Sequence, residues 1–129
     1  TRSGVRTPLP EPLFLYMSFF GFLDLLPNTI FNKETKMLTI NEYFDGKVKS
    51  IAFQNKQGNF TVGVMDIGEF EFGTNTIERM TVISGELIVR LPEKDNWQNF
   101  GTGETFTVAA HQKFQLKVEE PSAYLCQYE

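Results

Sequence analysis

Apolar and polar side chains alternate with a period of two along most of the chain from residue 47 onward. Val48, Ser50 and Ala52 fall on one side of the segment "KVKSIAF", and Lys49 and Ile51 on the other. This alternation is typical of half-buried β-strands. We predict strands at 47–53, 60–65, 69–72, 80–83, 86–91, 104–108, 113–118 and 123–128, for a total of seven to nine short strands.

The same segment contains turn signals between the strands and no helical pattern. "QNKQGN" at 54–59 is typical of a hairpin turn, Ser84 and Gly85 separate two strands, and Pro92 ends the second of them. No window has a sustained period of 3.6 residues. An all-β sandwich, jelly roll or small antiparallel barrel of a single domain therefore fits the pattern, with side chains filling the interior and space for a pocket at one mouth.

Residues 1–36 differ in character from the rest of the 129-residue chain. They carry early prolines and then an apolar run from Leu13 to Leu26, which contains Asp24 and stops at Pro27. That run is too short to cross a bilayer, which needs about 20 residues. Arg2 and Arg6 precede it as in a signal peptide, but no small-residue cleavage site follows. We expect 1–36 to be an extension without function and 37–129 to be the functional domain.

Composition and charge exclude several classes of partner. The chain is 41% hydrophobic and 22% charged, which is typical of a globular protein. Its net charge is -4 and its cations are scattered singly, so we expect no nucleic-acid surface and no membrane partner. The single cysteine, Cys126, cannot form an internal disulfide and fits a reducing compartment, so we expect a buried inert thiol in a cytoplasmic protein.

The spacing of several residues resembles the two metal-binding motifs of cupins, but most of the ligands are missing. Glu78 and Gly85 reproduce the end of the first motif, whose two histidine positions fall on Phe72 and Thr74. In the second motif the third histidine position falls on Phe114. A phenyl ring cannot bind a divalent cation, so we predict neither metal nor other cofactor. The lone His111, at a strand edge, is either a solvated surface group or part of a substrate site.

Longer stretches carry a more specific resemblance. "NEYFDGKVKSIAF", "VGVMDIGEFEFGT", "ERMTVISGELIVRLP", "GETFTVAAHQKF" and "AYLCQY" together are similar to the small bacterial pyrimidine/purine nucleoside phosphorylases, cupin-like proteins, across residues 37–129. Ala109 departs from the family pattern, which has proline there. The resemblance implies a cupin-like jelly-roll barrel that reversibly converts purine or pyrimidine nucleosides and inorganic phosphate to free base and ribose 1-phosphate.

Glu78 is the candidate catalytic residue for this chemistry. It shares the parity of Met80 and Val82, which turns it toward the interior, where it could bind ribose hydroxyls or stabilise an oxocarbenium-like transition state. A purely structural carboxylate is the alternative. Arg79 and Arg90 are the candidate phosphate ligands, although alternation sends Arg79 to the face opposite Glu78 and either could be a solvated rim charge.

Broad base tolerance requires an apolar slot, because a slot lined with hydrogen-bonding groups rejects analogues strongly. The candidate substrate-binding residues are Phe72, Thr74, His111, Phe114 and Tyr124. The aromatic ones could instead be ordinary core residues. A non-catalytic cupin that binds a small ligand or serves as a scaffold is the alternative function, and we expect a homodimer in either case.

Overall fold

The computed structural model describes residues 38–129, which form ten strands and no helix, and so none that could cross a membrane. The expectation about residues 1–36 lies outside the described residues and stays a prediction. The strands are β1 (Thr39–Tyr43), β2 (Val48–Asn55), β3 (Gly58–Met65), β4 (Gly68–Gly73), β5 (Glu78–Ser84), β6 (Glu86–Arg90), β7 (Gln98–Gly101), β8 (Thr105–Val108), β9 (Lys113–Val118) and β10 (Ser122–Tyr128).

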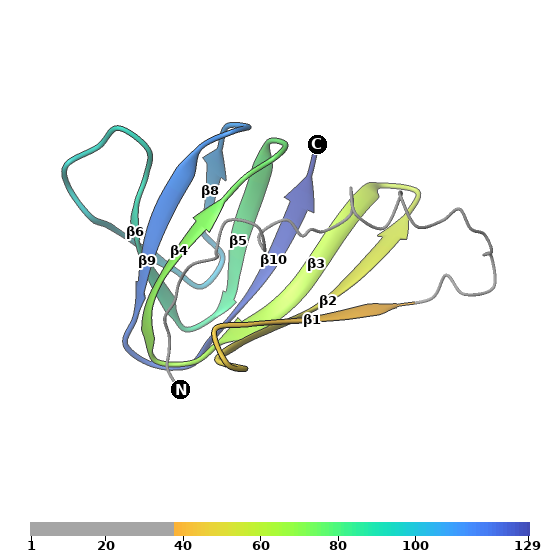
Figure 1. The fold of residues 1–129 in the computed structure, drawn as a ribbon, viewed down its shortest axis with the longest axis horizontal. Helices are drawn as coiled ribbons and strands as arrows, with labels where there is room; N and C mark the ends of the chain where they lie inside the picture. Colours follow the sequence, from red (N-terminus) through yellow and green to blue (C-terminus); the bar gives the residue numbers. More distant parts are fainter. Residues whose placement is uncertain (1–37) are drawn as a thin grey trace.

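The strands form two antiparallel sheets that face each other (Figure 1). The larger sheet has the order β1-β2-β3-β10-β5-β8, and the smaller has the order β4-β9-β6-β7. Strands distant in sequence are neighbours in both sheets, as in a jelly roll. The last strand, β10, lies in the middle of the larger sheet, where it pairs with β3 on one side and β5 on the other.

The alternation in the sequence sets which side chains the two sheets bury between them. Val48, Met65, Leu87 and Leu116 are almost completely buried and belong to one core cluster that draws on both sheets. On the outer face of the larger sheet, Ile40 pairs with Ile51 and both remain exposed. The predicted all-β fold with a filled interior is therefore confirmed for residues 38–129.

The number of strands differs from the expected seven to nine, because two of the ten were not predicted. β1 has the sequence "TINEY" and its inward positions include the polar Asn41, so its pattern lacks a clear apolar face. β7 has the sequence "QNFG", with Phe100 as its single apolar residue. Both strands lie at sheet edges, where pairing with one neighbour requires little apolar burial.

Candidate active site

Polar side chains gather on the inner face of the larger sheet. The strand register places Ser50 of β2 beside Asn41 of β1, and Gly63 of β3 between Ser50 and Tyr124 of β10. On the same face, β10 places Cys126 beside Thr61 and Tyr128 beside Glu78 of β5. We call this set the polar cluster: Asn41, Ser50, Thr61, Glu78, Tyr124, Cys126 and Tyr128.

Hydrogen bonds connect the members of the polar cluster. The Asn41 amide donates to Ser50 Oγ over 3.4 Å, and Ser50 and Tyr124 flank Gly63 from either side. Thr61 Oγ1 and Tyr128 Oη lie 3.0 Å apart. The Cys126 thiol donates to Glu78 Oε1 over 3.7 Å. The cluster therefore offers hydroxyl groups and one carboxyl group to a ligand that carries hydroxyls of its own.

Gly63 makes room for the Tyr124 side chain. A Cβ atom at Gly63 would stand 2.6 Å from Tyr124 Oη and 2.7 Å from the backbone oxygen of Lys49, closer than nonbonded atoms approach. Only a glycine at this point of β3 lets the tyrosine ring cross the strand and bring its hydroxyl to Ser50. Because Gly63 has no side chain, the Tyr124 ring can occupy its place in the polar cluster.

The Glu78 carboxyl is held in a poorly hydrated environment. The residue as a whole is partly exposed at the start of β5, but burial of its carboxyl group raises the pKa of Glu78 to about 8, despite the opposing effect of the Cys126 hydrogen bond. Burial also raises the pKa values of Tyr124, Cys126 and Tyr128. At neutral pH the titratable members of the polar cluster are therefore mostly uncharged.

Aromatic rings line the interior on the side of the smaller sheet. Phe72 of β4 and Phe114 of β9 are cross-strand partners, with ring centroids 6.0 Å apart. Tyr43 and Phe44, from the end of β1 and the turn after it, approach Phe72 with centroid distances of 6.2 and 5.4 Å. We call Tyr43, Phe44, Phe72 and Phe114 the aromatic wall. The predicted Phe72 and Phe114 are thus together, and the sequence reasoning missed Tyr43 of β1 and Phe44 of the turn after it.

Thr74 and His111 lie at a junction of two loops. The Thr74 hydroxyl donates to the backbone oxygen of Ala109 over 2.7 Å and accepts the N–H of Gln112 over 3.1 Å. The backbone N–H of His111 donates to the backbone oxygen of Thr74. His111 has a positive φ of 60°, and its side chain is exposed. These bonds give Thr74 a structural role in joining the β4–β5 loop to the β8–β9 turn.

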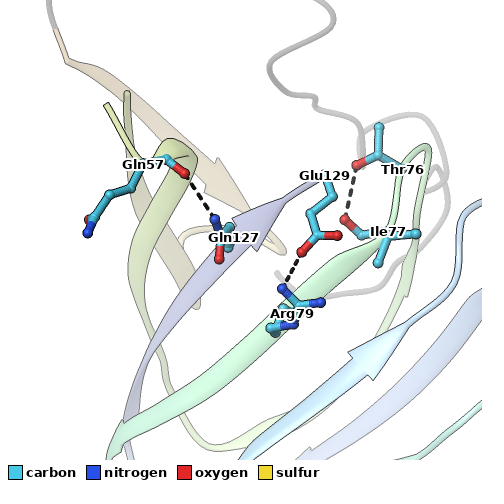
Figure 2. A network of polar contacts seen from close by, with 6 residues as sticks. All are labelled: Gln57, Thr76, Ile77, Arg79, Gln127 and Glu129. Carbon is cyan, nitrogen blue, oxygen red and sulfur yellow. Dashed lines mark hydrogen bonds and ion pairs between the residues drawn. The ribbon is translucent and has the colours of Figure 1, made fainter. Parts of the chain in front are cut away.

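The two candidate phosphate ligands do not lie with Glu78. Arg79 forms an ion pair with Glu129 at the end of the chain, as Figure 2 shows, and alternation on β5 turns it away from the interior as expected. Arg90 is 5.7 Å from the centre of the Trp97 ring, which Lys117 also approaches. It borders a pocket of about 280 Å³ that it shares with Lys94 and Lys113.

Four members of the polar cluster were not predicted as functional, namely Asn41, Ser50, Thr61 and Tyr128. A fifth member, Cys126, was expected to be inert. Cys126 is indeed buried, yet it contacts the carboxyl of Glu78. Parity along β2 and β10 would have placed Ser50 and Tyr128 inside, but only the pairing of β10 with β3 and β5 brings Tyr128 beside Glu78 and Tyr124 into the row of Ser50. Residues 38–129 contain no group of three His, Cys, Asp or Glu side chains that could hold a metal ion.

Comparison with known proteins assigns most of the chain to one group of enzymes. A family described as pyrimidine/purine nucleoside phosphorylase matches residues 38–128. A protein of that name, numbered 2, from Psychrobacter cryohalolentis is 60% identical over 92 residues, which are 71% of this chain and 98% of that one. The pyrimidine/purine nucleoside phosphorylase of Pseudomonas paraeruginosa is also 60% identical over 92 residues and is covered to 99%.

Solved structures share the fold. A Vibrio parahaemolyticus protein of unknown function is 41% identical, with a TM-score of 0.70 over 72% of this chain and 99% of that one. A cupin superfamily protein from Desulfitobacterium hafniense is 12% identical, with a TM-score of 0.53 over 68% of this chain and 80% of its own. The second match concerns the fold alone, and it confirms the cupin-like jelly roll.

Proposed function

Because this chain belongs to the pyrimidine/purine nucleoside phosphorylase family, we propose that it phosphorolyses both purine and pyrimidine nucleosides, reversibly and without a metal ion. The products would be the free base and ribose 1-phosphate. Family membership supports an enzyme with nucleoside and phosphate substrates, so it disfavours the alternative of a non-catalytic cupin.

The observation that carries this proposal is the pairing of two unlike surfaces inside one barrel. Hydroxyls and the Glu78 carboxyl line the larger sheet. The aromatic wall faces them with Phe72 and Phe114 of the smaller sheet, joined by Tyr43 and Phe44 from the end of β1 and the turn after it. A nucleoside has the matching division into a sugar with hydroxyl groups and a flat base. Aromatic side chains contact any base through its ring face, which agrees with tolerance of both base classes.

The donor set of the barrel supports a mechanism without metal. The three cupin ligand positions at Phe72, Thr74 and Phe114 carry two phenyl rings and a hydroxyl that bonds to backbone groups. Glu78 would then act directly on the substrate. Arg90, or Arg79 after release from Glu129, is proposed to bind phosphate. We propose further that the enzyme is a cytoplasmic homodimer.

The test is phosphate-dependent base release from adenosine, guanosine, uridine and cytidine. We expect release from at least one purine and one pyrimidine nucleoside in phosphate, none in phosphate-free buffer, and undiminished rates after treatment with EDTA. Release from one base class alone would contradict the role of the aromatic wall. Loss of activity in EDTA that returns with a divalent metal would contradict the metal-free mechanism.

A further inference from the structure

We propose that Glu78 is the general acid of this site, which donates its proton to the departing base, while the Cys126 thiol holds the other carboxyl oxygen. This inference rests on the proposed phosphorolysis and assigns one step of it. The base is a poor leaving group as an anion, so protonation of its ring as the glycosidic bond breaks lowers the barrier.

The position of Glu78 is the first observation behind this role. Glu78 opens β5, and its cross-strand neighbours are Tyr128 on β10 and Val108 on β8. Its parity with the buried Met80 turns it toward the interior, into which the aromatic wall also faces. The Glu78 carboxyl and the aromatic wall thus face the same interior between the two sheets.

The lack of a neighbouring cation among residues 38–129 favours the protonated form of Glu78. The two ion pairs within residues 38–129, Lys49–Glu42 and Arg79–Glu129, do not involve it. Among residues 38–129, the titratable groups that influence it or are influenced by it are Tyr124, Cys126 and Tyr128 of β10, all of which are neutral at physiological pH. The inward side chains of β8 and β9, Val108 and Phe114, carry no charge. A pKa of about 8 follows from this lack of hydration and of compensating charge.

Cys126 is the positioning residue in this arrangement. Its thiol donates to Glu78 Oε1, so this oxygen acts as an acceptor and the proton of a neutral carboxyl resides on Oε2. Cys126 is itself buried. Its partner in the strand register on β3 is Thr61, whose hydroxyl forms a hydrogen bond with the Tyr128 hydroxyl. The thiol therefore fixes one carboxyl oxygen from behind and leaves the other available to the substrate.

The proposed step balances without any further reactant. The bond from C1′ to the base nitrogen breaks with its electron pair on the base, and an oxygen of hydrogen phosphate bonds to C1′. The Glu78 proton passes to N7 of a purine or to a carbonyl oxygen of a pyrimidine. The proton that hydrogen phosphate carried then returns to Glu78, directly or through water, so the products are ribose 1-phosphate and a neutral base.

A pair of substrates that differ in their need for an acid provides the test. Guanosine requires a proton on the departing base, whereas 7-methylguanosine is already cationic and its base leaves as a neutral molecule. In Glu78→Gln, which cannot supply a proton, we expect kcat for guanosine to fall by about 10²-fold or more, and kcat for 7-methylguanosine to stay within about threefold. Glu69→Gln, a change of the same kind on the exposed side of β4, should leave both rates unaltered.

The possible outcomes separate this inference from the proposed function. An equal loss with both substrates would mean that Glu78 acts on the sugar, and no loss with either would remove it from the reaction; both results overturn the acid role alone. If the wild-type enzyme released no base from either substrate in phosphate, the proposed phosphorolysis itself would be wrong.

The pH profile supplies a second and independent readout. With adenosine, which does not ionise in this range, kcat should decline as pH rises above about 8, because Glu78 then loses its proton. The Cys126 hydrogen bond lowers the pKa of Glu78, so Cys126→Ala should move the decline to higher pH, and Cys126→Ser should return it toward the wild-type position. A flat profile up to pH 10 or an unmoved decline in Cys126→Ala would overturn the proposal.

Discussion

A carboxyl group whose pKa rises on folding makes stability depend on pH in an unusual direction. The pKa of Glu78 is about 8 in the folded protein, against an ordinary value of 4.5. Between these two values the folded chain keeps a proton that the unfolded chain releases. Rising pH therefore favours unfolding over this range, in contrast to the behaviour of a salt-bridged carboxylate.

We predict that Glu78→Gln removes this dependence. The wild type should lose stability relative to the variant as pH rises from about 5 to 8, by at most about 1.4 kcal/mol per pH unit, and partial exposure of the residue reduces the effect. Above pH 8 the difference should be constant. The measurement is the Tm of both proteins at intervals between pH 5 and 9. Glu69 is exposed, so the Tm of Glu69→Gln should differ from the wild-type Tm by a constant amount across this pH range. A constant difference for Glu78→Gln as well would contradict a buried neutral acid at Glu78.

At the scale of elements, the mouth of the barrel depends on how two loops are joined. Thr74 follows β4 and connects to the β8–β9 turn through its hydroxyl and through backbone bonds with Gln112 and His111. The same turn leads into β9 and Phe114 of the aromatic wall. A change in this junction would thus alter the position of an element that we propose contacts the substrate.

We predict that Thr74→Val lowers the free energy of unfolding by about 1 to 3 kcal/mol, because the Ala109 oxygen and the Gln112 N–H lose their partner at the buried Thr74 while the side-chain volume is nearly kept. Urea denaturation would measure this loss. Thr107→Val is the matched control, since Thr107 lies exposed on β8, and its stability should change by less than about 0.5 kcal/mol. Equal stability of the two variants would show that the Thr74 hydroxyl contributes nothing to the free energy of unfolding.

The sequence allowed the prediction of those elements whose alternation is strong. The strands around Phe70, Met80 and Leu116 have a clear apolar face, and their inward parity, with that of Glu78, agrees with the structure. β1 and β7 were missed because little apolar surface marks them. Most of the polar cluster was missed for a different reason, since contacts between residues distant in sequence assemble it, such as the Thr61–Tyr128 hydrogen bond across 67 positions.

At the scale of the whole molecule, one outer face bears an apolar row. Ile40, Ile51, Val62 and Leu125 are neighbours across β1, β2, β3 and β10 on the outside of the larger sheet. Ile40 is 71% exposed and Ile51 is 38% exposed. A continuous apolar row of this kind on neighbouring strands is typical of a surface that binds another protein, and a second copy of the chain would satisfy the expected homodimer.

We predict that Ile51→Asp shifts the mass in solution from that of a dimer to that of a monomer, because a charge in the row would be buried without a partner. Light scattering after size-exclusion chromatography would measure the mass. Ile77→Asp is the matched control, since Ile77 is 39% exposed but lies in the β4–β5 loop, and it should remain dimeric. A monomeric wild type would exclude the homodimer, and a dimeric Ile51→Asp would assign the contact to another surface.

The central position of β10 also affects the order in which a newly made chain can fold. A ribosome adds about 5 to 20 residues per second from the amino terminus, so Ser122–Tyr128 emerges after every other strand. Until its release, β3 and β5 lack the neighbour that joins them, and their open edges can pair with other chains. The interior, with Tyr124, Cys126 and Tyr128, closes only after β10 has emerged, and removal of Ser122–Tyr128 would leave the larger sheet as two separate pieces.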